Sequence, residues 1–341
     1  MEILFRVDSS KEIGFGHLHR CLNLANHLKK NASITFISRN FKNSNLALIK
    51  KNKFKLIILK KKLRVANQKK DALETINNIN KKYDLLIVDH YALGYKWEKS
   101  LSNFTKKLMV IDDYLTKKHF CNIILNYNFA VKKISYKNYF LKKTKFLLGS
   151  KYAIINSKYN KVKKIKKELN KIFIFLGTDN RYTTKNILNI LKKKKLFKNK
   201  FEIVLTKGVR GFQSQIDFVK KLKNCNVYFG LPNLIKVIQK TQIGIVSGGQ
   251  IVFECLKMGL PLIVFQTAKN QEMSCKFLKK KKMINFMGVF NKEKTNVFLN
   301  TFKELTTNKK LRYNQTKKIK DIIDGKGVER VSRYLINSIK K

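Results

Sequence analysis

The chain has 341 residues, of which 44% are hydrophobic and 28% are charged. These values suit two folded domains and exclude a wholly disordered protein. Lys and Arg together number 75 against 21 Asp and Glu, which gives a net charge of +54. Most of these cations are Lys spread along the whole sequence, whereas Arg, whose planar fork reads phosphates and bases, is scarce. We therefore attribute the charge to a Lys-rich composition, and expect no specific nucleic-acid partner and only weak contact with an anionic membrane surface.

The five cysteines lie far apart and form no C-x-x-C pair. This spacing favours reduced thiols over a disulfide framework or a zinc site. The residues after Met1 lack the charged and apolar regions of a signal peptide, and no apolar stretch approaches the roughly 20 residues that span a bilayer. We therefore expect a cytoplasmic protein that has no transmembrane segment and acts as a monomer.

Short apolar runs alternate with helical patterns through both halves of the chain, which is typical of β-α-β units around a parallel sheet. In the first half we predict strands at 3–7, 34–37, 56–59, 85–88, 108–111 and 123–125, and helices at 18–28, 72–79 and 97–104. In the second half we predict strands at 172–176, 201–205, 227–229, 243–246 and 260–265, and helices at 183–191, 212–222, 231–239, 251–258 and 273–278.

These elements predict an α/β protein with two doubly wound, Rossmann-like domains. The first domain spans residues 1–155, a Lys-rich linker spans 156–171, the second domain spans 172–310, and a helical segment at 311–341 ends the chain. In such sheets ligands bind beyond the carboxyl ends of the strands. We therefore expect the ligand in a cleft where the two domains face each other.

The first predicted strand leads into a G-x-G loop, Gly14 and Gly16, and then into a helix. Glycines allow close approach of a ligand, and the start of a helix favours an anion. His17 falls in the first helical turn, where an imidazole can act as a general base or donate to a phosphate. Arg20 stands near the place of the third glycine of a dinucleotide site, and His17 and His19 diverge on a helix, which disfavours a metal pair. The alternative is a capping turn with a solvated histidine.

Two later strands of the first half also end in polar residues. Asp89, His90 and Tyr91 follow one strand, and Asp112 and Asp113 follow the next. The carboxyl ends of parallel strands lie at the same edge of a sheet, so these side chains are candidates for the ligand site. Simple strand termination is the alternative, since Asp is common in turns.

The second half opens with a strand that ends at Gly177, Thr178 and Asp179, just before a helix. A glycine followed by small polar residues at the start of a helix makes a turn that can accept an anion. We therefore expect this turn to contact a phosphate or a sugar.

A second turn of this kind lies at Gly248 and Gly249, between a strand and a helix. The start of this helix can bind a diphosphate, and Glu254, one turn later, can accept hydrogen bonds from ribose hydroxyls. An ordinary exposed helix residue is the alternative for Glu254. Asn270 and Gln271 follow the next strand.

Together and in this order, the motifs resemble those of the UDP-2,4-diacetamido-2,4,6-trideoxy-β-L-altropyranose hydrolases of pseudaminic acid biosynthesis. The resemblance covers nearly the whole chain. The motifs that carry it are Arg6-x-Asp8, Gly14-x-Gly16-His17-x-x-Arg20, Asp89-His90-Tyr91, Asp112-Asp113, Leu147-Leu148-Gly149, Gly177-Thr178-Asp179, Ser247-Gly248-Gly249 with Glu254, Asn270-Gln271 and Asp324-Gly325-Lys326-Gly327. It implies a two-domain glycosyltransferase-B (GT-B) architecture, related to the N-acetylglucosaminyltransferase that makes lipid II. It also implies that water attacks the anomeric carbon of a UDP-sugar with inversion and release of UDP, without a metal or another cofactor.

The resemblance also implies roles for individual residues. His17 matches the histidine that activates the water, and we expect Asp8 or Asp89 to orient it. The residues expected to bind substrate are Gly14, Gly16, Arg20, His90, Tyr91, Gly177, Thr178, Asp179, Gly248, Gly249, Glu254, Asn270 and Gln271. Among these, Arg20 is expected to help meet the charge of the diphosphate, and Glu254 to bind the ribose.

Three positions depart from the family pattern. Leu176 replaces a glycine, Asn180 stands where proline is frequent, and His19 stands where an apolar residue is usual. The first departure bears on how closely a ligand approaches the turn at Gly177. Three other functions stay open: a glycosyltransferase of the same fold, hydrolysis of a different nucleotide-linked amino sugar, and a basic nucleic-acid-binding protein. The sequence does not determine the stereochemistry of the sugar.

Overall fold

The computed structural model describes residues 1–10, 12–60, 67–115, 117–136, 143–161, 170–179, 181–207, 209–231 and 233–340. The chain divides into two compact units. The first unit is Met1–Ser157 together with Gly325–Lys341, and the second is Lys158–Asp324. The end of the chain is therefore divided between the two units. Residues up to Asp324 belong to the second unit, and residues from Gly325 onward belong to the first. Half of the segment expected as a linker, residues 162–169, lies outside the described residues.

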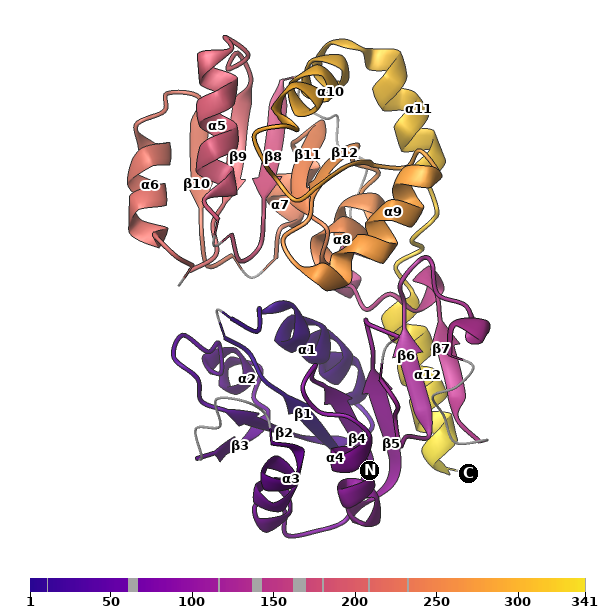
Figure 1. Ribbon diagram of the computed structural model, residues 1–341. Helices are drawn as coiled ribbons and strands as arrows, with labels where there is room; N and C mark the ends of the chain where they lie inside the picture. Colours follow the sequence, from indigo (N-terminus) through magenta and orange to yellow (C-terminus); the bar gives the residue numbers. More distant parts are fainter. Residues whose placement is uncertain are drawn as a thin grey trace. The chain divides into compact units, whose positions relative to one another are not determined.

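The first unit contains a seven-stranded parallel sheet in the order β3-β2-β1-β4-β5-β6-β7 (Figure 1). Its strands are β1 (Glu2–Val7), β2 (Ser33–Arg39), β3 (Lys55–Leu59), β4 (Tyr83–Asp89), β5 (Thr105–Ile111), β6 (Ile123–Asn126) and β7 (Lys145–Leu148). Its helices are α1 (Gly16–Leu28), α2 (Ala47–Lys51), α3 (Gln68–Asn77), α4 (Tyr95–Leu101) and α12 (Gly327–Lys340). The strand order reverses between β1 and β4, and this reversal is the switch point at which ligands bind in such sheets.

The second unit contains a six-stranded parallel sheet in the order β10-β9-β8-β11-β12-β13. Its strands are β8 (Lys171–Phe175), β9 (Lys200–Val204), β10 (Cys225–Tyr228), β11 (Ile243–Ser247), β12 (Leu262–Phe265) and β13 (Asn285–Gly288). Its helices are α5 (Thr183–Lys193), α6 (Phe212–Lys220), α7 (Ile235–Gln239), α8 (Gln250–Lys257), α9 (Glu272–Lys280), α10 (Thr295–Thr307) and α11 (Lys309–Ile319). Here the switch point lies between β8 and β11. The expectation of two doubly wound α/β sheets is confirmed.

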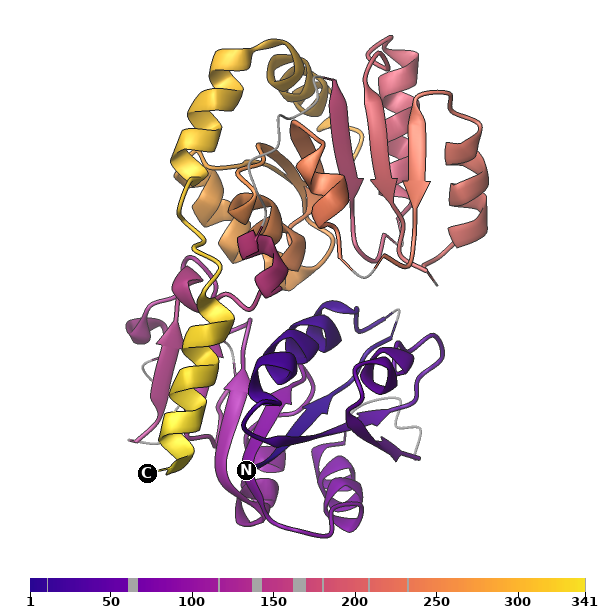
Figure 2. The same ribbon diagram turned by 180° about the vertical axis from the view of Figure 1, so that it is seen from behind.

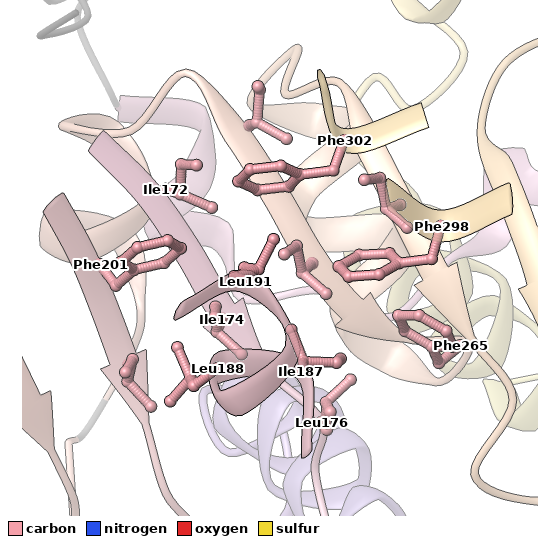
Figure 3. Packing of buried hydrophobic residues seen from close by; sticks show 14 of the residues in the cluster. Ile172, Ile174, Leu176, Ile187, Leu188, Leu191, Phe201, Phe265, Phe298 and Phe302 are labelled. Atoms are coloured by element: carbon pink, nitrogen blue, oxygen red, sulfur yellow. The ribbon is translucent and has the colours of Figure 1, made fainter. Parts of the chain in front are cut away.

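The strands of both sheets read as continuous apolar runs because helices cover both faces (Figures 1 and 2). Figure 3 shows one core of the second unit, in which alternate residues of β8 face α5 and α10. The labelled residues are Ile172, Ile174, Leu176, Ile187, Leu188, Leu191, Phe201, Phe265, Phe298 and Phe302. Each is almost completely buried, and full burial of such a side chain contributes about 1.5–3 kcal/mol. Leu176, which stands where the resembling family has a glycine, belongs to this core. Its side chain therefore packs in the core and does not obstruct the turn at Gly177.

The sequence analysis missed several short or polar elements. β7 and β13 are four-residue strands at the edges of their sheets, where a short apolar run resembles a loop. α10 begins without a side-chain cap and carries many polar residues. The terminal helical segment, which we expect to be broken near Gly325 and Gly327, consists of α11, which ends at Ile319, and α12, which begins at Gly327. The two helices belong to different units.

No helix within the described ranges is long and apolar enough to cross a membrane. Among the described His, Cys, Asp and Glu side chains, no group of three is arranged to hold a metal ion.

Helix α12 docks onto the first unit through a glycine. It packs against α1 and against the short 3₁₀ helix Ser150–Tyr152. A Cβ atom added at Gly327 would lie 2.6 Å from the backbone nitrogen of Ala153. Only a residue without a side chain therefore allows this contact.

We expect Gly327→Ala to destabilise the first unit by about 1–3 kcal/mol, because backbone atoms cannot move aside as a flexible side chain can. Urea unfolding measures the change. Gly16→Ala is the control, since a Cβ there would meet nothing within 4 Å, and it should change stability by less than about 0.5 kcal/mol. Equal stability of the two variants would contradict the docking role of Gly327.

Candidate functional site

The switch point of the first sheet brings two of the predicted motifs together. β1 and β4 pair in parallel, with Val7 opposite Asp89, so the two strands end side by side. Asp89 is the last residue of β4, and His17 lies in the first turn of α1, which follows β1. The two side chains are almost fully buried. The G-x-G loop lets the chain turn back to this edge, because Gly14 has a φ of +92°, which residues with a side chain rarely adopt.

His17 and Asp89 form a close pair. His17 Nδ1 lies 2.6 Å from Asp89 Oδ1. Burial alone would raise the pKa of Asp89, but the positive charge of Arg20 and the contact with His17 hold it well below its ordinary value. Asp89 is therefore ionised and can only accept. Arg20 NH2, which can only donate, lies 3.2 Å from the same Nδ1 atom, but its two protons are taken by carboxylate oxygens at 2.6 and 2.9 Å. The proton of the neutral imidazole is therefore on Nδ1, and Nε2 is left as a proton acceptor. This is the arrangement that a general base requires.

The aromatic ring of Tyr91 lies against the His17 ring. The two rings meet edge to face, with their centroids 4.3 Å apart. The Tyr91 hydroxyl donates to Asp113 Oδ2 at 2.7 Å. His17 is thus held at its Nδ1 atom by a carboxylate and at its ring by an aromatic side chain.

Asp8, the other carboxylate expected to orient His17, belongs to a separate network. Its oxygens accept from the Arg6 guanidinium at 2.5 and 3.0 Å and from the backbone N–H of Arg39 at 2.8 Å. Burial would raise the pKa of Asp8, and the charge of Arg6 together with a hydrogen bond from His90 holds it well below its ordinary value. Of the two candidates, Asp89 is the one that contacts His17.

His90 is engaged by protein groups at both ring nitrogens. Nε2 lies 3.0 Å from Asp8 Oδ2, and Nδ1 accepts from the backbone N–H of Ala92 at 3.1 Å. Burial lowers the pKa of His90, which favours the neutral ring that these two bonds require. His90 therefore ties the loop after β4 to the end of β1.

The second switch point carries the turn expected to bind a diphosphate. Gly248 and Gly249 join β11 to α8, and the N-terminus of α8 has no side-chain cap. A Cβ at Gly248 would lie 2.7 Å from the Cys275 sulfur and 2.9 Å from Gln271 Cβ, so α9 packs directly on this turn. Backbone N–H groups at a helix start without a side-chain cap favour an anion.

Gln271 and Asn270 lie beside this turn, in the 3₁₀ helix Lys269–Gln271. The Gln271 amide folds back on Thr267, whose backbone N–H donates to Oε1 at 2.8 Å and whose hydroxyl lies 3.0 Å from Nε2. Gln271 therefore braces the loop after β12 next to Gly248.

Glu254 is half-buried on α8. The Tyr159 hydroxyl donates to its Oε2 atom at 2.6 Å. Burial raises the pKa of Glu254 to about 7. The carboxyl that the sequence suggests for ribose is therefore held by a tyrosine from a segment that was expected to be linker, where no sequence signal marked it.

The turn at Gly177 differs from the expectation of an anion site. Asp179 is buried, and its two carboxylate oxygens accept from the backbone N–H groups of Thr183 and Thr184 at 2.9 and 2.7 Å. The start of α5 thus already holds an anion, the carboxylate of the protein itself. Gly177 has a φ of +63°, so the glycine serves the turn. The expected departure at Asn180 lies outside the described residues.

Asp113, which the sequence analysis selected, and Tyr127, which it did not, complete the first site. They both bind Arg20, at 2.9 and 3.1 Å from its NH1 nitrogen. Asp113 follows β5, which pairs with β4, and Tyr127 follows β6, which pairs with β5, so the rule that selected Asp89 also applies to Tyr127. The sequence does not show which of the several side chains at the strand ends contact one another.

Comparisons with known proteins find distant relatives of the chain. No family model matches the chain. The chain is 28% identical, over 285 residues, to the UDP-2,4-diacetamido-2,4,6-trideoxy-beta-L-altropyranose hydrolase of Campylobacter jejuni, covering 82% of this chain and 97% of that protein. It is 27% identical to an uncharacterized protein of Methanocaldococcus jannaschii over 82% of this chain and 59% of that protein.

Solved structures with low sequence identity share the fold. The MurG protein of Acinetobacter baumannii superposes with a TM-score of 0.66 at 12% identity, covering 98% of this chain and 99% of that one. Phytolacca americana UGT2, complexed with UDP-2fluoro-glucose and pterostilbene, gives 0.69 at 10% identity over the whole of both chains. The chain therefore has the GT-B fold of glycosyltransferases, and it is a distant relative of a UDP-sugar hydrolase.

The raised pKa of Glu254 predicts a pH-dependent contribution to stability. The folded protein keeps a proton on this carboxyl up to a pH of about 7, whereas the unfolded chain loses it near 4.5. The free energy of unfolding should therefore fall as the pH rises through this interval. We expect Glu254→Gln, which cannot titrate, to remove that part of the slope in urea unfolding. Glu304→Gln, at an exposed position of the same unit, should keep it, and an unchanged slope in Glu254→Gln would contradict the assignment.

Proposed function

We propose that the chain hydrolyses a UDP-linked sugar to the free sugar and UDP. The observation that carries the proposal is the contact between His17 Nδ1 and the ionised Asp89, which leaves Nε2 able to take a proton from water. The Campylobacter jejuni relative is named as a hydrolase of a UDP-sugar, which supports the same reaction.

The nucleotide is assigned to the second unit. We assign the diphosphate to the start of α8 at Gly248 and Gly249, which has no side-chain cap. We assign the ribose hydroxyls to Glu254, one turn later on the same helix. Asn270 and Gln271 flank this turn and are assigned to the phosphates or the sugar. Three of the structural neighbours were solved with UDP or a UDP-sugar analogue, which supports a nucleotide of this kind.

The reaction that we propose is an inverting displacement at the anomeric carbon. Water attacks C1 as the bond to the diphosphate breaks, and the proton of the water passes to His17 Nε2. The sugar passes through an oxocarbenium-like state, and the charge that develops on the leaving diphosphate is met by the N–H groups at the start of α8. A base at this step contributes about 100- to 10,000-fold. No step requires a metal ion.

The name of the Campylobacter jejuni relative supports a UDP-linked 2,4-diacetamido-2,4,6-trideoxy sugar as the substrate. With the resemblance of the motifs, we propose that the free sugar is used in the biosynthesis of pseudaminic acid. A glycosyltransferase is the second candidate, because the MurG and UGT2 neighbours share the fold over the whole chain. The two candidates differ in what attacks C1. A hydrolase releases UDP in the absence of an acceptor, whereas a transferase requires one.

A UDP-release assay in ¹⁸O-labelled water with EDTA distinguishes these candidates. We expect release of UDP from the diacetamido-trideoxy-altrose substrate without any acceptor, label in the sugar and none in UDP, and NMR of the first anomer formed should show inversion. UDP release that depends on an added acceptor would favour the transferase. Label in UDP would mean attack at phosphorus and would contradict the proposed step.

Variants of His17 and Glu254 test the division of roles. We expect His17→Ala to lower kcat by about 100- to 10,000-fold with UDP affinity kept, because the base acts only on the water. Glu254→Ala should weaken UDP binding more than it lowers kcat. His27→Ala, at the other end of α1, is the control and should keep wild-type activity. Wild-type turnover in His17→Ala would show that the assigned base is wrong.

A further inference from the structure

Arg20 was expected to meet the charge of the diphosphate, but its surroundings suggest another role. It lies on α1, one turn after His17, and its side chain is only 7% exposed. A guanidinium has five N–H donors and no acceptor. The question is therefore which acceptors these five donors reach.

Each of the five donors has an acceptor within the first unit. Nε and NH2 donate to the two oxygens of Asp89, both at 2.6 Å. NH1 and NH2 donate to the two oxygens of Asp113, both at 2.9 Å. The remaining N–H of NH1 donates to the Tyr127 hydroxyl at 3.1 Å. Two carboxylates thus occupy both forks of the guanidinium, which is the strongest pairing that Arg makes.

These contacts form a closed circuit of five side chains that includes the candidate base. His17 binds Asp89, Asp89 binds Arg20, Arg20 binds Asp113, and Asp113 accepts from Tyr91. The aromatic ring of Tyr91 contacts the imidazole of His17 edge to face, which closes the circuit. Arg20 is central to the circuit, since it binds both carboxylates.

We propose that Arg20 is a positioning residue for His17 and not a ligand of the diphosphate. Its role in turnover rests on the proposed function, whereas its effect on the His17 ring does not. A phosphate could bind Arg20 only by displacing a carboxylate from a buried, bidentate contact. The geometry instead fixes the plane of Asp89, and through it the direction of the His17 ring.

The Tyr91 ring is held in place through the same guanidinium. Arg20 binds Asp113, and Asp113 accepts from the Tyr91 hydroxyl. Without the guanidinium, the carboxylates of Asp89 and Asp113 would have no cation between them and would repel each other. The His17 and Tyr91 rings would then lose their fixed edge-to-face contact.

The test follows the His17 ring by NMR of histidine-labelled protein, since the chain has five His residues. We expect Arg20→Gln to move the ring-proton chemical shifts of His17 toward those of a free imidazole, because the Tyr91 ring that lies against His17 is no longer held in place. Arg20→Lys should restore less than half of this change, because it restores the charge without the two forks. The value of kcat should fall in both variants. Arg333→Gln, exposed on α12 of the same unit, is the control and should change neither the chemical shifts nor kcat.

Asp113→Asn removes the charged link between Arg20 and Tyr91 and keeps the proposal testable if Arg20→Gln does not fold. The ring-proton chemical shifts of His17 should move in the same direction as in Arg20→Gln, because the Tyr91 hydroxyl loses its ionised acceptor. No change in either variant would overturn the proposal.

Binding of UDP separates positioning from phosphate binding. We expect the affinity of the Arg20 variants for UDP, measured by calorimetry, to stay within about threefold of the wild type. A loss of about tenfold or more, which is typical of a lost charged contact, would overturn the proposal. If the NMR shifts follow the prediction while the wild type turns over no UDP-sugar, the positioning role stands and the proposed hydrolysis fails.

Discussion

The first unit depends on one buried carboxylate that stays ionised. Asp89 ends a strand that is covered on both faces, and burial alone would make its charge costly. The charge is stable there because Arg20 binds both oxygens and His17 binds one of them. The same carboxylate fixes the tautomer of His17, so electrostatic stability of the fold and the chemistry of the site rest on the same contacts.

The second unit uses the same topology for a different purpose. Its switch point carries a glycine turn and the start of a helix instead of a buried acid–base pair. Here none of the described residues holds a cation against the carboxyl of Glu254, and its pKa is raised where that of Asp89 is lowered. A neutral carboxyl would not repel the diphosphate that we propose for the neighbouring turn.

The sequence predicts those features that depend on local pattern. Alternating apolar runs located most strands, and strand-end polar residues located Asp89 and Asp113. The sequence does not predict which side chains contact one another. Spacing could not decide between Asp8 and Asp89 as the partner of His17, because both lie at the ends of adjacent strands and only the directions of their side chains differ. Spacing also could not show that Asp179 caps α5, that Tyr159 donates to Glu254, or that Arg20 donates to two carboxylates. Each of these contacts depends on the three-dimensional fold and leaves no periodic pattern in the sequence.

The central claim is that His17 carries its proton on Nδ1 and presents Nε2 as the base. Nitrogen chemical shifts of ¹⁵N-histidine-labelled wild-type protein, recorded at a pH where the ring is neutral, report this tautomer directly. The account predicts a protonated Nδ1 and an unprotonated Nε2 for His17, and loss of that preference in Asp89→Asn. A His17 ring protonated on Nε2 in the wild type would contradict it.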